Sequence, residues 1–174
     1  MNEIILVTGG VQSGKSDFAE KIAKKFDQIT YIALSERRDT DSKWQAKINK
    51  HKFKRPKNWR LIETDDLIDV LRKEQGILII DSIGGFIVKS IREDDKSWGK
   101  YLDNLIDLLS SYDNKIVIVG EQVGLGLMSE FEVGNIFAER LGEVLKAITN
   151  IASENWLTIN GKAIRLDNIY ISEP

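Results

Sequence analysis

The chain has 174 residues, a net charge of −2 at neutral pH and no cysteine. This length fits one domain over residues 1–174 with a sizeable core. The lack of cysteine excludes a disulfide framework and a thiolate metal site, and the charge argues against nucleic acid as the main partner. Apolar runs are too short to span a bilayer, and a strand pattern begins where a signal peptide would stand, so we expect a cytoplasmic protein.

The first motif along the chain is a complete phosphate-loop pattern. A β-branched, apolar run at 3–8 predicts a strand, and an amphipathic pattern at 15–26 predicts a helix. Between them stands G-x-x-x-x-G-K-S, which consists of Gly9, Gly10, Val11, Gln12, Ser13, Gly14, Lys15 and Ser16. In this context the loop N–H groups surround a phosphate, Lys15 reaches the β- and γ-phosphates, and Ser16 holds Mg²⁺. The motif therefore predicts binding of a nucleoside triphosphate.

A basic segment follows the second strand pattern. It runs from Lys43 to Arg60 without an acidic residue and contains His51, the single histidine of the chain. The helical pattern at 42–51 turns His51 toward the body of the protein. A histidine at a helix end is usually a cap or a partly buried structural residue. A neutral imidazole among cations could also attack a triphosphate and carry a nucleotidyl group. The pattern alone leaves both roles open.

The remaining elements alternate along the chain. Strand patterns occupy 29–34, 77–81 and 115–119, and helical patterns occupy 65–74, 98–112 and 130–152. Strands that are apolar almost throughout and alternate with helices indicate a mostly parallel sheet with helices on both faces. We therefore predict an α/β fold of the phosphate-loop type.

Two local signals mark the C-terminal part of the chain. Ser129 and Glu132 have the spacing of a capping box at the start of the last helix. Two short alternating runs, 156–159 and 163–166, flank Asn160-Gly161, which predicts a β-hairpin with a type I′ turn. This hairpin should add an antiparallel element at the edge of the sheet.

Asp81 ends the apolar strand pattern at 77–81. Ligands of parallel sheets bind at the carboxyl ends of the strands, and a phosphate-loop protein places its second metal-associated carboxylate at such a strand end. Asp81 is therefore a candidate to hold Mg²⁺, directly or through water. The alternative is an aspartate that caps the turn after the strand.

Four stretches together resemble the bifunctional adenosylcobinamide kinase/adenosylcobinamide-phosphate guanylyltransferase family, across essentially the whole chain. They are the phosphate loop with Thr8 before it, Tyr31-Ile32-Ala33, the segment 47–60 with Arg55-Pro56 and Trp59, and Val123-Gly124-Leu125-Gly126. The histidine segment is the specific part, because a phosphate loop alone serves many activities. Three stretches differ from the family pattern: Glu121-Gln122 replaces Asn-Glu, Gly142–Lys146 replaces G-R-x-N-Q, and Ser82-Ile83-Gly84-Gly85 replaces T or L residues. The spacing from Tyr31 to His51 is also slightly longer than in the family.

The resemblance implies a RecA-like sheet, a homotrimer and two reactions of cobalamin biosynthesis. One phosphorylates adenosylcobinamide with ATP or GTP, and the other transfers GMP from GTP to adenosylcobinamide phosphate through a guanylyl-histidine. Matched by motif, that histidine is His51, with Lys15 as the second catalytic residue, and Ser16 and Asp81 as the Mg²⁺ ligands. Outside the phosphate loop, the implied nucleotide-binding residues are Ala33, Leu34, Ser35, Lys52, Phe53, Lys54, Arg55, Glu63 and Asp81.

Two other functions remain compatible with these residues. A simple small-molecule kinase would depend on Lys15, while His51 would be structural. A nucleotide-binding regulatory module would hydrolyse its nucleotide slowly and transfer no group. The three hypotheses differ in whether cobinamide is modified and whether His51 carries GMP.

Overall fold

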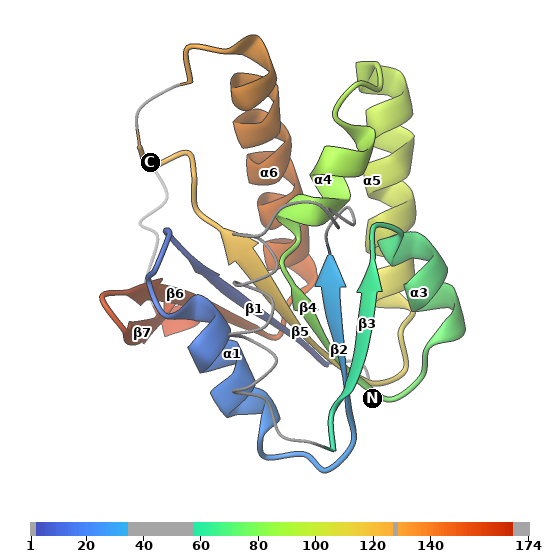
Figure 1. Ribbon diagram of the computed structural model, residues 1–174, viewed down its shortest axis with the longest axis vertical. Helices are drawn as coiled ribbons and strands as arrows, with labels where there is room; N and C mark the ends of the chain where they lie inside the picture. Colours follow the sequence, from blue (N-terminus) through green and yellow to red (C-terminus); the bar gives the residue numbers. More distant parts are fainter. Residues whose placement is uncertain (1–2, 35–57, 127–128, 169–174) are drawn as a thin grey trace, which may run out of the picture.

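The computed structural model describes residues 3–34, 58–126 and 129–168. Its framework is a seven-stranded sheet with the order β3-β2-β4-β5-β1-β6-β7 (Figure 1). The strands are β1 (Glu3–Gly9), β2 (Ile29–Leu34), β3 (Arg60–Thr64), β4 (Ile77–Asp81), β5 (Lys115–Glu121), β6 (Glu154–Ile159) and β7 (Lys162–Arg165). The helices are α1 (Lys15–Ala23), α3 (Leu67–Lys73), α4 (Gly84–Ser90), α5 (Asp95–Ser110), α6 (Glu132–Ile151) and the short 3₁₀ helix η1 (Leu166–Asn168).

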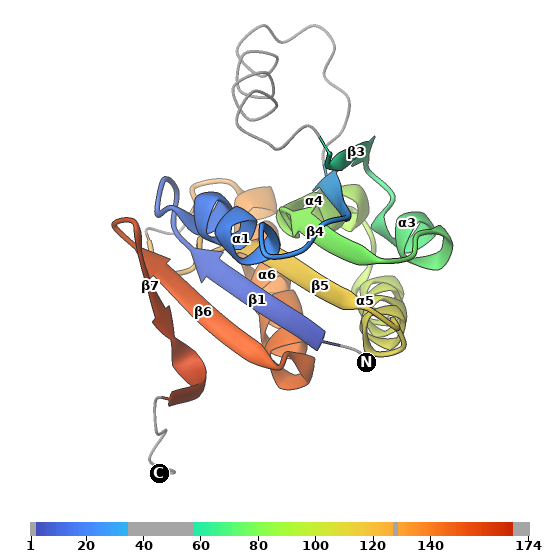
Figure 2. The ribbon, with the colours of Figure 1, turned by 90° about the horizontal axis from the view of Figure 1, so that it is seen from below.

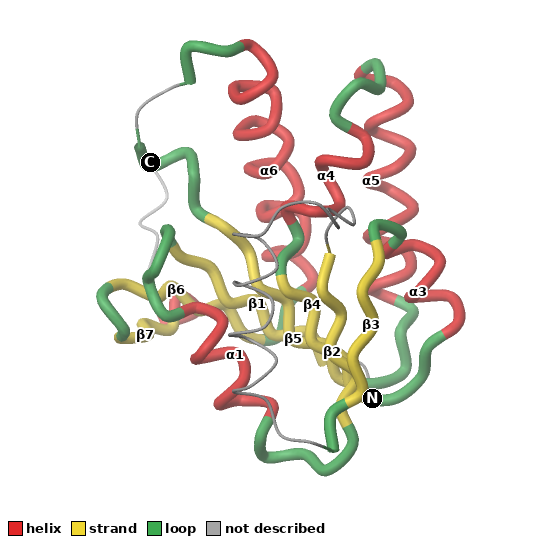
Figure 3. The backbone as a smooth tube through the Cα atoms, in the orientation of Figure 1, coloured by secondary structure: helices red, strands yellow, loops and turns green. Residues whose placement is uncertain are grey.

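The sheet is parallel except at one edge. β1 pairs in parallel with β5 and with β6, and β4 pairs in parallel with β2 and β5. Only β7, paired with β6, runs antiparallel among the described strands (Figure 3). The central strands are apolar on both faces because helices cover both sides. The predicted α/β architecture with an edge hairpin is confirmed.

Helices cover the two faces of the sheet unequally (Figure 2). α1 packs on one face through Ala19 and Ala23, against a cluster that includes Val7, Tyr31 and Val117. The other face carries α3, α4, α5 and α6 over a larger cluster. We call these the α1 face and the α6 face. Alternate residues of each strand contribute to opposite faces, as the pleat requires.

β3, α4 and the short 3₁₀ helix η1 were not expected from the sequence. β3 has no fully buried residue, because it is an edge strand that pairs only with β2 among the described strands. α4 begins with Gly84-Gly85, which are poor helix formers. A side chain at Gly85 would run into the backbone of Leu34, so close packing of α4 on β2 requires glycine there.

The C-terminal signals had different outcomes. Asn160 and Gly161 have φ angles of 51° and 76°, so the predicted type I′ turn is confirmed. The predicted capping box is wrong, because α6 begins at Glu132 after Phe131 and has no side-chain cap. Instead, the Asn135 side chain bonds the backbone N–H and carbonyl of Ser129. No helix in the described ranges is long and apolar enough to cross a membrane.

Candidate nucleotide-binding site

The phosphate-loop motif forms a tight turn between β1 and α1. The N–H of Ser13 donates to the carbonyl of Gly10 (3.3 Å), and the first helical turn closes with Phe18 N–H on Gly14 (2.9 Å). Gly14 has φ of 93° and Gln12 has φ of 57°, both in the left-handed region, which glycine enters at least cost. This backbone brings successive N–H groups to the start of a helix, where an anion is favoured.

Lys15 is the first residue of α1 and lies over the loop. Its ammonium group donates a hydrogen bond to the carbonyl of Gly10, with Nζ and O 3.1 Å apart. The flexible stem of lysine lets the ammonium group move a few ångströms to a phosphate without any change in the backbone. Ser16 follows in the first turn of the same helix. The loop thus joins backbone donors, one cation and one hydroxyl at the carboxyl end of β1.

Asp81 lies at the carboxyl end of β4, two strands from β1. Ile79 belongs to the cluster on the α1 face, so Asp81, two residues later, points to the same face. The hydroxyl of Tyr31, on β2, donates a hydrogen bond to Oδ2 of Asp81. Tyr31 is itself buried and its ring stacks on Trp59, with centroids 6.4 Å apart. A rigid aromatic residue therefore orients the carboxylate.

Glu121 is not among the site residues predicted from the sequence, where it stands out only as part of a stretch that differs from the family pattern. It ends β5, the strand between β1 and β4, and is the register partner of Gly9. Its carboxylate accepts hydrogen bonds from the hydroxyl of Ser82 and from the N–H of Gly84 (3.2 Å). A carboxylate thus stands between the phosphate loop and Asp81. The available signal was its place directly after an apolar strand.

The other predicted nucleotide-binding residues are spread along the sheet. Ala33 and Leu34 end β2, and Glu63 lies beside Ala33 on β3. Since neighbouring strands are about 4.8 Å apart, Glu63 is on the far edge from β1, and the structure does not bring it to the phosphate loop. The predicted helix at 42–51 and six predicted site residues lie outside the described residues: Ser35, His51, Lys52, Phe53, Lys54 and Arg55.

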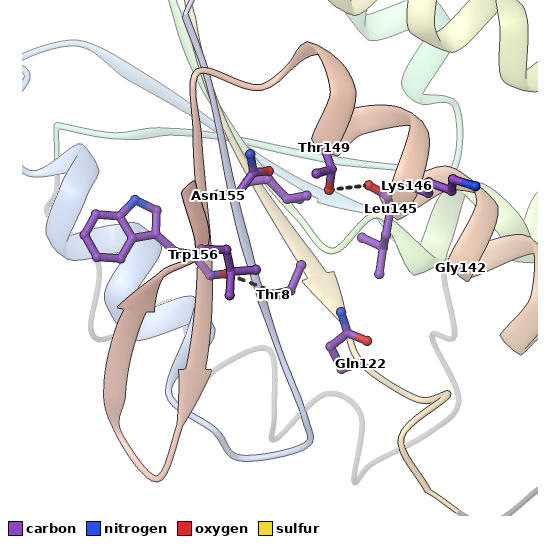
Figure 4. Close-up of a pocket in the computed structure, with 10 residues that line it drawn as sticks. Thr8, Gln122, Gly142, Leu145, Lys146, Thr149, Asn155 and Trp156 are labelled. Carbon is purple, nitrogen blue, oxygen red and sulfur yellow. Dashed lines mark hydrogen bonds between the residues drawn. The ribbon is translucent and has the colours of Figure 1, made fainter. Parts of the chain in front are cut away.

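A pocket of about 250 Å³ opens on the α6 face (Figure 4). Its lining includes Thr8, Gln122, Lys146, Thr149 and Asn155. The Oδ1 atom of Asn155 is buried there without a hydrogen-bond partner within the described part of the chain. Gln122 and Lys146 come from two of the stretches that differ from the family pattern, so the fold brings these two differences together, on the face opposite α1.

The sheet order, the loop between β1 and α1, and the carboxylates at neighbouring strand ends define a phosphate-loop α/β protein. A family model described as cobinamide kinase / cobinamide phosphate guanyltransferase, CobU, matches residues 5–166. The chain belongs to this family of bifunctional kinases and guanylyltransferases, which confirms the resemblance seen in the sequence.

Curated relatives match along nearly the whole chain. The chain is 26% identical to a bifunctional adenosylcobalamin biosynthesis protein CobU of Escherichia coli, covering 94% of this chain and 99% of the relative. It is 28% identical to the Salmonella typhimurium CobU with the same coverage. It is 27% identical to the Pseudomonas aeruginosa CobP, covering 90% and 92%.

A solved structure of a Pyrococcus horikoshii protein has a similar fold. The TM-score is 0.52 at 11% sequence identity, and the match covers 97% of this chain and 87% of that one. At this identity the likeness concerns the fold alone.

Proposed function

We propose that this protein phosphorylates adenosylcobinamide and then transfers GMP from GTP to the resulting phosphate, as a step in adenosylcobalamin biosynthesis. The observation that carries the proposal is the formed phosphate loop in a chain of the cobinamide kinase / cobinamide phosphate guanyltransferase family. The names of the curated relatives, which match along 90% or more of the chain, support the pathway. ATP or GTP would serve as phosphoryl donor.

In the kinase step, the loop from Gly9 to Ser16 would hold the β- and γ-phosphates. Lys15 would move from the Gly10 carbonyl, 3.1 Å away, to the phosphate oxygens, where its charge offsets the charge that develops during transfer. The hydroxyl of cobinamide attacks the γ-phosphorus, and the bond to the nucleoside diphosphate breaks. Glu121 stands at the strand end beside the loop, and Asp81 stands at the end of the next strand.

Ser16 and Asp81 are the side chains that would hold Mg²⁺. Their oxygen atoms fit this ion, which typically combines one or two protein oxygens with phosphates and waters. Within the described ranges, no group of three or more His, Cys, Asp or Glu side chains gathers as a metal site, so the protein would supply few ligands. When bound, the ion would neutralise charge on the phosphate oxygens. Tyr31 would keep the Asp81 carboxylate oriented.

In the guanylyl step, an imidazole nitrogen of His51 would attack the α-phosphorus of GTP. The N–P bond forms as the bond to pyrophosphate breaks, and a neutral imidazole is suited to this attack. The phosphate of adenosylcobinamide phosphate then attacks the same phosphorus, which breaks the N–P bond and frees the histidine. The motif match around His51 supports this assignment, with Ala33 to Ser35, Lys52 to Arg55 and Glu63 as nucleotide contacts.

The resemblance also supports an assembly and a location. We infer a homotrimer in the cytoplasm, formed by one domain per chain, with sites near subunit boundaries. Size-exclusion chromatography with light scattering tests the trimer, and a monomer at working concentration would contradict it.

The test of the proposed function follows both products by mass spectrometry. Wild-type protein with adenosylcobinamide, GTP and Mg²⁺ should form first the phosphate and then the GDP-linked product. Lys15→Ala should abolish phosphorylation, whereas Lys21→Ala, an exposed position in α1, should leave it intact. His51→Ala should phosphorylate but transfer no GMP. Absence of phosphorylated cobinamide with the wild type would refute the function, and GMP transfer by His51→Ala would refute its mechanism.

A further inference from the structure

The turn of the C-terminal hairpin packs against the phosphate loop, at the left of Figure 2. Ser13 Oγ and Thr158 Oγ1 are 2.8 Å apart. The N–H of Gly161 donates to the carbonyl of Ser13, at 2.9 Å. A Cβ atom on Gly14 would lie 3.2 Å from the Cα of Gly161, so the two backbones are close. Segments about 145 residues apart in sequence therefore form one unit.

The hydroxyl of Thr158 makes two hydrogen bonds, and its single proton fixes their directions. Thr158 Oγ1 donates to the carbonyl of Thr8, at 3.0 Å. Because this uses the only proton of Thr158, the hydroxyl of Ser13 must donate to Thr158 Oγ1. Ser13 and Thr158 are 7% and 2% exposed. The buried hydroxyl of Thr158 thus links Thr8, which precedes the loop, to Ser13 within the loop.

These bonds hold the loop by groups that do not face the phosphate. The Ser13 hydroxyl and carbonyl are both bound to the hairpin, so neither competes with a phosphate for the loop N–H groups. A loop that already has the bound shape loses less conformational freedom when the ligand arrives. The hairpin lies at the sheet edge, beyond β1 and away from Asp81.

We propose that Thr158 is a positioning residue, which holds the phosphate loop in its binding shape through Ser13 and Thr8. The inference rests on the proposed function, in which this loop holds the β- and γ-phosphates. The hairpin predicted from sequence as a simple edge element is then a support of the nucleotide site. Loss of the Thr158 hydroxyl should therefore weaken binding of the β- and γ-phosphates and leave binding of the nucleoside unchanged.

The test measures binding of GTP and of GMP by isothermal titration calorimetry. Thr158→Val, which keeps the shape and removes the hydroxyl, should weaken GTP binding roughly tenfold, the size expected for loss of a buried hydrogen-bond pair. Thr158→Val should bind GMP, which lacks the β- and γ-phosphates, with the same affinity as the wild type. Thr158→Ser should restore GTP affinity to within about twofold. Thr149→Val is the matched control, since among the described residues that hydroxyl bonds the carbonyl of Leu145, within α6 itself.

The outcomes separate this inference from the proposed function. If the wild type binds GTP and Thr158→Val binds it equally well, the hairpin does not position the loop. Equal weakening of GTP and GMP, or failure of Thr158→Ser to restore affinity, would also overturn the inference, because a general structural defect acts in this way. If Thr158→Val does not fold, Ser13→Ala should show the same selective loss. A wild type that binds neither GTP nor ATP would refute the proposed function itself.

Discussion

The two faces of the sheet contribute differently to stability and to the nucleotide-binding site. Over the described residues, the cluster on the α6 face has 23 buried apolar residues and that on the α1 face has nine. Apolar burial is the dominant favourable term in folding, so the α6 face contributes more to the free energy of unfolding. The loop leading into α1, Tyr31 and Asp81 belong to the α1 side. Substitutions should therefore separate activity from stability by face.

The strongest separation is expected at Lys15. In the proposed function Lys15 is the cation that offsets charge on the transferred phosphate, so for Lys15→Ala we expect kcat/KM for cobinamide phosphorylation to fall about a thousandfold. The free energy of unfolding should change by less than about 0.5 kcal/mol, as for most surface substitutions. Steady-state kinetics and urea unfolding give the two numbers, with Lys21→Ala as the control. A large loss of stability with little loss of rate would contradict the assignment of activity to the α1 face.

The opposite behaviour is expected at Arg140 on the α6 face. Its buried guanidinium group donates to the carbonyls of Ser90 and Glu93, both at 2.6 Å, and lies 5.0 Å from the ring centroid of Trp98. Arg140→Ala takes this donor from the carbonyl of Glu93, while the carbonyl of Ser90 keeps the bond from the N–H of Glu93 at 3.0 Å. Loss of the charged donor and of its contact with Trp98 should lower the free energy of unfolding by about 3 kcal/mol. Urea unfolding measures this loss, and the exposed Arg92→Ala is the control.

The affinity for GTP shows whether Arg140 affects stability alone or also the nucleotide-binding site. GTP binding by folded Arg140→Ala should equal that of the wild type. A tenfold weaker affinity would show that the α6 face shapes the phosphate site.

A smaller effect is expected at Tyr31. Tyr31→Phe removes the hydroxyl that orients Asp81, and we expect the Mg²⁺ concentration for half-maximal rate to rise about tenfold. Tyr112→Phe is the matched control, because that hydroxyl donates to the carbonyl of Gly76 at 2.8 Å and its residue packs in the α6-face cluster. Titration of the kinase rate with Mg²⁺ checks this. The same shift in both variants would contradict a specific role for Tyr31.

The smallest effect concerns pH and the α6 face. A hydrogen bond from Lys89 and the N–H of Asp69 lower the pKa of Asp66, the N-cap of α3, below its ordinary value. The stability that this carboxylate contributes is present above its unfolded pKa of about 3.9 and is lost as the pH falls through the lower folded value. Asp66→Asn should make the free energy of unfolding less dependent on pH below about 4. Urea unfolding at pH 7, 4 and 3 measures this.

The control for the pH prediction is Asp103→Asn, at an exposed position of α5. It should keep the wild-type pH dependence. A wild-type profile in Asp66→Asn would show that the ion pair with Lys89 contributes nothing measurable, as is common for exposed pairs.

The sequence predicted the parts of the fold that depend on local order. The phosphate loop, the apolar strands and the Asn160-Gly161 turn are set by neighbouring residues. β3 and α4 were missed because each is short and owes its structure to packing on β2. The capping box failed because the Asn135 side chain, six residues from Ser129, takes its place at the start of α6.

The site was predictable only in part for the same reason. Lys15, Ser16 and Asp81 follow strands and could be placed by motif. The bonds from Tyr31 to Asp81 and from Ser13 to Thr158 join residues 50 and 145 positions apart. No local pattern encodes such contacts, because they depend on the order of strands in the sheet. The role of His51 stays a prediction, since it lies outside the described residues.

The most direct test of the account is the intact mass of the protein after incubation with GTP and Mg²⁺. The account predicts a mass increase of one guanylyl group in the wild type, stable to base and labile to acid, and discharged by adenosylcobinamide phosphate. His51→Ala should show no increase. A wild-type protein that binds GTP yet gains no mass, or a His51→Ala variant that gains it, would contradict the account.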